Sequence, residues 1–241
     1  MWKQIKRSVR AAIKRIVMEA VDEALENDAF NMERQIQRSA MIQSSEYICE
    51  TIELAKRFGD RYKLMKHCLE LISPTGLILE FGVYRGDSIR FIGEQVDSRP
   101  VFGFDSFEGL NEAWSFAPRG AFSDVGQLTQ IPENVTLIKG WFDRTLPGFL
   151  EEHAGPIALL HIDSDLYSSC SYLLRQLSPR LIKGSVIVFD ELLNYPGWQR
   201  GEFQAFNEWK DATKIQFEFV GFVPKREICP SASQVAIRIA D

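Results

Sequence analysis

The sequence has few cysteines and no long apolar run, and each absence excludes a class of protein. Its four cysteines, Cys49, Cys68, Cys170 and Cys229, show neither the spacing of metal ligands nor a disulfide framework, so we expect free thiols in a reducing cytosol. No apolar run approaches the roughly 20 residues that cross a bilayer, and the N-terminal stretch lacks the apolar core and cleavage site of a signal peptide. We therefore expect a cytoplasmic protein.

Charge is unevenly distributed along the chain. The formal net charge of -5 argues against a nucleic-acid partner. Six basic residues precede the first acidic residue, Glu19, so the N-terminal segment is basic and the remainder is acidic. The chain shows no internal repeat or low-complexity segment, and 241 residues suffice for one α/β domain with a modest extension. We expect a helical N-terminal extension over residues 1–72 and an α/β domain over residues 73–241.

The basic segment, residues 1–27, has apolar side chains three and four positions apart, which is typical of an amphipathic helix. One interpretation is peripheral contact with an anionic membrane surface, which would place the protein at the inner face of the membrane. The other is a helix that packs on its own domain or on a second subunit. We favour the second interpretation, and with it a homo-oligomer.

From Ser73 onward the pattern alternates between strands and helices. Before it, residues 31–71 have a helical pattern with one break near Gly59. Strands are expected at residues 77–81, 101–104, 135–138, 157–162 and 186–189, and helices at 88–95, 168–177 and 202–209. Two further alternating segments, 215–222 and 235–239, predict an antiparallel hairpin. The predicted fold class is α/β: a doubly wound, Rossmann-like, mostly parallel seven-stranded sheet with an antiparallel C-terminal hairpin.

Acidic residues follow two of the expected strands. The apolar run at 157–162 leads into Asp163 and Asp165, and the run at 186–189 leads into Asp190 and Glu191. An all-apolar run is typical of a parallel strand buried on both faces, and ligands of open α/β sheets bind at the carboxyl edge. Like charges gathered there repel one another. The sequence therefore predicts a hard cation such as Mg²⁺ bound by these carboxylates.

The loop after the first core strand has the features of a cofactor site. Gly82 and Gly86 allow a tight turn, while Glu80 and Asp87 would repel a phosphate, so an adenosine ligand with a positive charge fits better. S-adenosylmethionine is the commonest such ligand. Asp105, at the end of the second strand, suits a ribose hydroxyl pair. Aromatic residues after the third strand, Trp141 and Phe142, suit either an adenine ring or core packing.

Five motifs then occur in a fixed order. They are Leu79–Gly86, Gly103–Leu110, Lys139–Phe142 with Thr145–Pro147, His161–Tyr167, and Phe189–Glu191. Together they resemble the macrocin O-methyltransferase family of metal-dependent sugar O-methyltransferases, which have the class I fold and use S-adenosylmethionine. The resemblance covers residues 73–241 and not the basic segment, and it implies that this part is a class I methyltransferase domain.

The resemblance also implies roles for individual residues. It makes Asp163, Asp190 and Glu191 ligands of Mg²⁺ and makes Asp165 the general base. The candidate cofactor-binding residues are Glu80, Gly82, Tyr84, Gly86, Ser88, Asp105, Ser106, Gly140, Trp141 and Phe142. Two positions depart from the family pattern: Glu191 stands where an aspartate is common, and Asn111 replaces a usual proline, so the lid over the cofactor is expected to sit differently.

The chemistry of these residues agrees with transfer of a methyl group to a sugar hydroxyl. A divalent ion lowers the pKa of a bound hydroxyl, and Asp165 then takes the proton. Two neighbouring hydroxyls would chelate the ion, so we expect a vicinal diol in a nucleotide sugar, a glycan or a glycosylated natural product. Alternatives are a catechol-type acceptor, a metal-dependent glycosyltransferase and a non-enzymatic adaptor. His161 is expected to be a hydrogen-bonded core histidine rather than a site residue.

Overall fold

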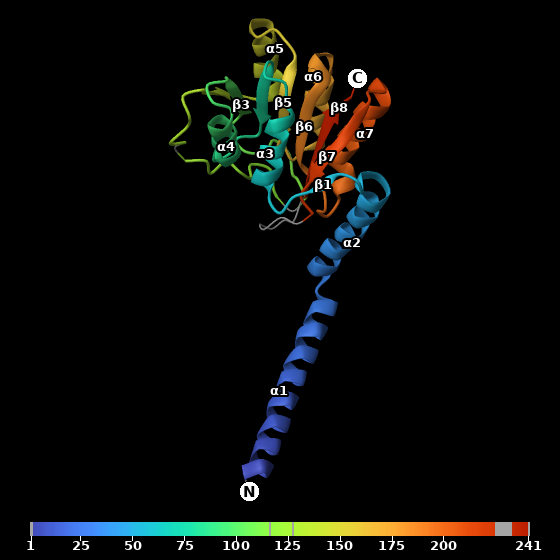
Figure 1. Ribbon diagram of the computed structural model, residues 1–241. Helices are drawn as coiled ribbons and strands as arrows, with labels where there is room; N and C mark the ends of the chain where they lie inside the picture. Colours follow the sequence, from blue (N-terminus) through green and yellow to red (C-terminus); the bar gives the residue numbers. More distant parts are fainter. Residues whose placement is uncertain (1, 116, 127, 225–232, 241) are drawn as a thin grey trace.

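A single eight-stranded sheet forms the centre of the molecule (Figure 1). The structure is a computed structural model, and it describes residues 2–115, 117–126, 128–224 and 233–240. The strand order is β1-β7-β8-β6-β5-β2-β3-β4. The strand bounds are β1 Lys56–Arg57, β2 Leu77–Phe81, β3 Val101–Asp105, β4 Val135–Lys139, β5 Ile157–Ile162, β6 Leu181–Leu193, β7 Phe217–Phe222 and β8 Ser233–Ile239.

Helices precede the sheet and connect its strands. Two of them begin at capping residues, because Asn31 accepts a hydrogen bond from the Arg34 amide and Asp60 accepts one from the Lys63 amide. The helix bounds are α1 Trp2–Phe30, α2 Met32–Tyr47, a π-helical turn Ile48–Ile52, α3 Arg61–Leu71, α4 Asp87–Gln95, α5 Phe142–Glu152, α6 Tyr167–Leu177 and α7 Glu202–Thr213, with short 3₁₀ turns at Ser178–Arg180 and Trp198–Arg200.

Two hydrophobic clusters lie on opposite faces of the sheet. One joins Leu79, Leu160 and Ile187 to the apolar faces of α5, α6 and α7. The other joins Ile78 and Leu159 to α3 and α4. All six residues of β5 are buried, which agrees with a strand covered on both faces. The architecture is therefore three-layered, and the predicted fold class is confirmed, with β8 antiparallel to both β6 and β7.

Two elements differ from the sequence prediction. The segment Lys56–Arg57, expected within a helical stretch, is a two-residue strand that pairs parallel with β7, so the sheet has eight strands rather than seven. Helix α5 was not expected at all. It contains Pro147 followed by Gly148, and both residues disfavour a helix interior, so the local sequence does not predict a helix here. Packing on the sheet stabilises this helix.

The N-terminal extension contacts the sheet through α2 rather than α1. Gln37 in α2 donates to the Asn194 carbonyl, and Ser44 accepts from the Asn194 amide, both at 2.9 Å. Helix α1 continues outward from α2 and projects away from the sheet (Figure 1). None of the helices in the described ranges combines the length and the apolar character that a bilayer crossing requires.

The three described cysteines are free thiols, as expected. Cys68 and Cys170 are buried and Cys49 is exposed, whereas Cys229 lies outside the described residues. Burial raises the pKa of Cys68 to about 12, so this thiol stays protonated at neutral pH.

The ends of β2 and β5 approach one another closely at Gly82. After β2 the chain adds β3 and β4 on one side of this strand, and it then crosses to add β5 and β6 on the other side. The strand order therefore reverses between β2 and β5, which is the switch point of the sheet. Gly82 has φ +96°, and a Cβ atom built on it would lie 1.7 Å from the carbonyl oxygen of Asp163. The approach of these two tips therefore requires glycine at position 82.

We predict that Gly82→Ala lowers the free energy of unfolding by at least ~3 kcal/mol, because left-handed strain adds to a backbone overlap. Urea unfolding measures the loss. Gly120→Ala is the matched control, since Gly120 also has a positive φ of +84° but would meet nothing within 4 Å. That control should lose only about 1–2 kcal/mol. Equal losses in the two variants would contradict the claim that the strand tips depend on this close contact.

Candidate functional site

A cavity of about 450 Å³ opens at the carboxyl ends of β2, β3, β5 and β6. Six of the ten candidate cofactor residues line it: Gly82, Tyr84, Asp105, Ser106, Trp141 and Phe142. Asp163, Asp165 and Glu191 line it as well, together with Asn111 of the β3–β4 loop. The structure thus brings together residues from five separate sequence motifs around one space large enough for a small ligand.

Four candidate cofactor residues, Glu80, Gly86, Ser88 and Gly140, do not line the cavity. Glu80 has no exposed surface and lies beneath the cavity floor, where Ser88 donates to one of its oxygens at 3.0 Å. Glu80 therefore holds the side chains of Ser88 and His161.

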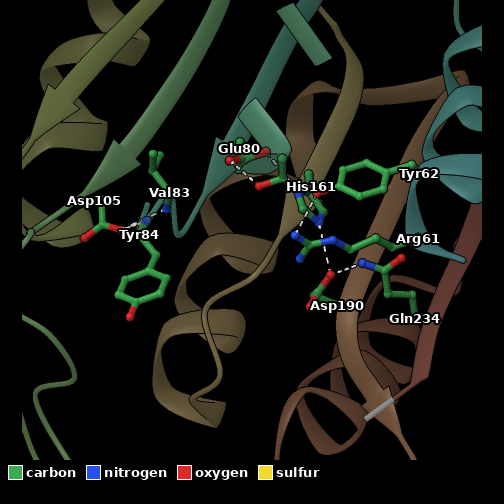
Figure 2. Close-up of polar contacts among 10 residues, drawn as sticks. Arg61, Tyr62, Glu80, Val83, Tyr84, Asp105, His161, Asp190 and Gln234 are labelled. Carbon is green, nitrogen blue, oxygen red and sulfur yellow. Dashed lines mark hydrogen bonds and ion pairs between the residues drawn. The ribbon is translucent and has the colours of Figure 1, made fainter. Parts of the chain in front are cut away.

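Asp105 supports the loop that would surround the cofactor. One of its oxygens accepts hydrogen bonds from the Val83 and Tyr84 amides, both at 2.8 Å, and the other accepts from the Phe107 amide at 2.7 Å (Figure 2). The carboxylate therefore ties the tip of β3 to the β2–α4 loop. It still borders the cavity, so it both shapes the loop and offers charge to a ligand.

The acidic residues form two groups that share Asp163. In one, ligand atoms of Asp163, Asp165 and Glu191 lie within 4.8 Å of one another, and in the other those of His161, Asp163 and Asp190 do. The predicted ligands Asp163, Asp190 and Glu191 are therefore neighbours but do not form one group. Asp190 is fully buried and does not line the cavity.

Strand geometry explains this division. Consecutive residues of a strand point to opposite faces, so Asp190 and Glu191 diverge. They lie where the pairing of β6 with β8 shifts, between Phe189 and Leu193, and such irregularities redirect side chains next to binding sites.

Asp165 lies in a strained turn after β5. Its φ is +60°, and the Leu166 amide donates to the Ser164 carbonyl at 2.6 Å, which closes a tight three-residue turn around it. Non-glycine residues held in this conformation cost free energy and are concentrated at functional sites. The turn fixes where the Asp165 carboxylate points.

The chemistry of the two groups decides which of them fits a cation. Asp163, Asp165 and Glu191 offer only carboxylate oxygens beside the cavity, which is the ligand type that Mg²⁺ prefers. In the other group, His161 already bonds Glu80 through Nδ1 and faces Asp190 through Nε2. The residues on the cavity side therefore fit a hard divalent ion, and His161 fits a structural role.

A row of buried polar side chains crosses four adjacent strands beneath the cavity (Figure 2). His161 Nδ1 on β5 lies 3.0 Å from Glu80 Oε2 on β2, and its Nε2 lies 3.6 Å from Asp190 Oδ1 on β6. Gln234 on β8 donates to Asp190. The row thus links Asp190 to the cofactor loop through side chains that have almost no exposed surface. It also confirms His161 as a hydrogen-bonded core histidine.

His161 carries the compensating charge of this row. Burial lowers the pKa of its imidazole, but the contact with Asp190, the hydrogen bond with Glu80 and the charges of Glu80 and Asp163 outweigh burial and raise the pKa to about 10. The ring is therefore an imidazolium at neutral pH, and it neutralises carboxylates that would otherwise be buried together.

Glu202 is a site residue that the sequence did not indicate. This first residue of α7 is fully buried, and its two oxygens accept from the Ser164 amide at 3.5 Å and the Glu191 amide at 3.2 Å. Burial, together with the charges of Asp163, Asp165 and Asp190, raises the pKa of Glu202 well above its usual value. Glu202 therefore braces the tips of both acid-bearing strands, although its sequence position suggested only a helix start.

Arg61 and the β3–β4 loop complete the cavity. Arg61, at the start of α3, borders it, and Figure 2 shows its guanidinium beside Asp190. In the loop, Asp124 accepts hydrogen bonds from Tyr84 at 2.9 Å and Arg85 at 2.6 Å. The loop is thereby tied over the β2–α4 turn.

The chain is similar to known methyltransferases. Residues 79–192 match a family model described as a methyltransferase domain. A Streptomyces olivaceus protein named 8-demethyl-8-(2,3-dimethoxy-alpha-L-rhamnosyl)-tetracenomycin-C 4'-O-methyltransferase is 28% identical over 157 residues, which are 53% of this chain and 58% of that protein. Demethyldecarbamoylnovobiocin O-methyltransferase of Streptomyces niveus is 23% identical over 163 residues, 56% of this chain and 61% of that protein.

The fold also has relatives of known structure. The crystal structure of the calicheamicin methyltransferase CalS11 superposes with a TM-score of 0.57 and 22% identity, covering 88% of this chain and 94% of that one. The matched region spans about three fifths of the length of the two curated relatives. The comparisons confirm the resemblance to sugar O-methyltransferases that the five motifs predicted.

We predict that removing His161 changes how stability depends on pH. The folded pKa of about 10 exceeds the usual 6.5, so the stabilising contribution is complete below pH 6.5 and is lost as the pH rises through about 10. Urea unfolding of the wild type should therefore show a larger loss of free energy between pH 6.5 and pH 10 than unfolding of His161→Gln. All other titrating groups are common to both proteins, so parallel pH profiles would argue against a buried imidazolium.

We predict that Glu202→Ala lowers the free energy of unfolding by about 2 kcal/mol or more, because it leaves two buried amides without an acceptor. Glu202→Gln should lose much less, since it retains an acceptor oxygen and is neutral, which is the form that the raised pKa of Glu202 favours. Chemical denaturation compares the two variants. Glu151→Ala, at an exposed position of α5, is the control and should have little effect. A glutamine variant as unstable as the alanine variant would refute the bracing role.

Proposed function

We propose that this chain is a cytoplasmic, S-adenosylmethionine-dependent O-methyltransferase that methylates a hydroxyl of a sugar vicinal diol with the help of Mg²⁺. The observation that carries the proposal is the group of Asp163, Asp165 and Glu191 at the tips of neighbouring parallel strands, beside a cavity of about 450 Å³. The methyltransferase domain at residues 79–192 and the rhamnosyl-directed relative support the reaction and the class of acceptor.

The cofactor would occupy the part of the cavity bordered by Gly82, Tyr84, Asp105 and Ser106, with Trp141 and Phe142 beside its adenine ring. A sulfonium centre is attracted by the surrounding carboxylates, whereas a phosphate would be repelled. The ring of Phe142 is held edge-on against Phe81, with centroids 5.3 Å apart, so this wall is fixed before a ligand enters. The cofactor supplies the methyl group.

We propose that Asp163 and Glu191, which border the cavity, hold the metal ion together with the buried Asp190, whose ligand atom lies within 4.8 Å of one of Asp163, and that Asp165 accepts the proton of the acceptor hydroxyl. Bound Mg²⁺ lowers the pKa of a hydroxyl and orients its oxygen. Asp163 belongs to both groups of potential ligands, so the ion would depend most on this residue. Asp165 is held by its strained turn at the cavity wall, where a general base must reach the acceptor. Glu202 keeps the two strand tips at a fixed separation.

The domain boundary and the assembly are part of the same proposal. We propose that residues 73–241 form the catalytic domain and that residues 1–72 form an N-terminal extension, of which β1 and α3 pack on the sheet and α1 is the interaction element. Its most distal part, residues 1–27, was expected either to touch the inner face of a membrane or to pair with another subunit. Because α1 has its described side chains exposed along most of its length, we favour a homo-oligomer.

We predict that Asp165→Asn lowers methyl transfer by about 10²–10⁴-fold while leaving the affinities for S-adenosylhomocysteine and Mg²⁺ nearly unchanged. Transfer is measured with radiolabelled S-adenosylmethionine on a panel of glycosides and nucleotide sugars, and binding is measured by calorimetry. Full activity of this variant would refute the assignment of the base.

We predict that Asp190→Asn, unlike Asp165→Asn, affects metal binding. This variant should weaken Mg²⁺ binding as well as activity, because it removes a proposed ligand. If Asp165→Asn weakened Mg²⁺ binding and Asp190→Asn did not, the ion would be held by Asp163, Asp165 and Glu191 alone, and the proposed base would be wrong. Absence of S-adenosylhomocysteine binding to the wild type would overturn the function itself.

A further inference from the structure

Helix α1 exposes a continuous apolar stripe. The side chains of this stripe are exposed by fractions between 44% for Val21 and 74% for Trp2. The stripe consists of Trp2, Ile5, Val9, Ile13, Ile16, Val17, Val21 and Leu25. The helix projects away from the sheet as a rod (Figure 1), and its 29 residues correspond to a length of about 43 Å. An exposed stripe of this extent marks an interaction surface.

Charge along the rod is divided into two halves. Six basic residues lie between positions 3 and 15, and five acidic residues lie between positions 19 and 28. The apolar stripe runs through both halves without interruption. A partner that covers the whole stripe must therefore match a positive half and a negative half at once.

We propose that α1 pairs in antiparallel orientation with α1 of a second copy of this chain. In that orientation the basic half of each helix faces the acidic half of the other, and the two helix dipoles oppose one another favourably. A parallel pair would place like charges together. An anionic membrane would attract the basic half but repel the acidic half, which carries the same stripe.

The sequence of α1 contains a register that satisfies both patterns. An antiparallel alignment that sets Ile13 opposite Ile16 places Val9 opposite Ala20 and Ile5 opposite Ala24, while Val17, Val21 and Leu25 fall opposite Ala12, Ser8 and Gln4. The same alignment sets basic residues level with acidic ones: Lys6 with Glu23, Arg7 with Asp22, and Arg10 with Glu19. Such a contact is self-complementary, which is the property of a two-fold symmetric dimer.

The first test is sedimentation of the full chain. The wild type should be a dimer, and Val9→Asp with Ile13→Asp should be monomeric while it binds S-adenosylhomocysteine as tightly as before. The matched control is Gln4→Asp with Ala11→Asp, which adds the same charge to the opposite side of the same half and should remain dimeric. A monomeric wild type, or a dimer that survives the substitutions in the stripe, would overturn the proposal.

Charge reversal tests the orientation. Lys6→Glu, Arg7→Glu and Arg10→Glu together should raise the dissociation constant of the dimer about tenfold or more, because the acidic half then faces an acidic half. Adding Glu19→Lys, Asp22→Lys and Glu23→Lys should restore the wild-type value. A parallel pair would respond to neither change in this way, so loss without restoration, or no loss, contradicts the antiparallel arrangement.

Flotation with vesicles of phosphatidylglycerol and phosphatidylcholine separates the membrane alternative. Wild-type protein that stays at the bottom of the gradient as a dimer supports the proposal. Protein that floats in proportion to phosphatidylglycerol, and does so as a monomer, overturns it. Neither result bears on methyl transfer, since the cofactor cavity lies in the sheet domain and its ligand binding is measured separately.

Discussion

Electrostatic repulsion among carboxylates at two neighbouring strand tips is the constraint around which this site is built. Asp163 and Asp165 follow β5, Asp190 and Glu191 lie within the last part of β6, and Glu202 accepts hydrogen bonds from the backbone of both segments. A buried cluster of negative charge is costly unless cations and hydrogen-bond donors surround it. The fold supplies the His161 imidazolium, the Arg61 guanidinium and the backbone amides of the strand tips. A divalent ion on the cavity side would complete this compensation.

The two sides of the cluster have different characters. Toward α3 and α4, the row from Glu80 to Gln234 is buried, and its charges are balanced within the protein. Toward the cavity, Asp163, Asp165 and Glu191 are available to a ligand. Asp163 belongs to both groups, so it adjoins both the buried row and the cavity. This arrangement separates the groups that hold the site rigid from the groups that would do the chemistry.

Much of this arrangement was predictable from sequence, because the signals are local. The all-apolar runs identified the buried strands, and the acids directly after them had to emerge at one edge of a parallel sheet. The roles of Glu80 and Glu202 were not predictable in this way. Whether a glutamate faces a ligand or binds an internal histidine depends on which strand lies next to it. The histidine that binds Glu80 is 81 residues away in the chain, and the two amides that Glu202 binds are 11 and 38 residues away. Helix α5 was not predicted because its local sequence is misleading. Pro147 and Gly148 disfavour a helix, but tertiary packing stabilises one here.

The position of β8 has a consequence for biosynthesis. This strand follows β7 in the chain but inserts between β6 and β7, and it brings Gln234 to Asp190. Until it emerges from the ribosome, β6 has an unpaired edge and Asp190 lacks one of its donors. The N-terminal portion of the sheet can fold during translation, but the carboxylate cluster reaches its final geometry only after residue 234 has been synthesised. The site therefore reaches its final geometry only after β8 has paired with β6.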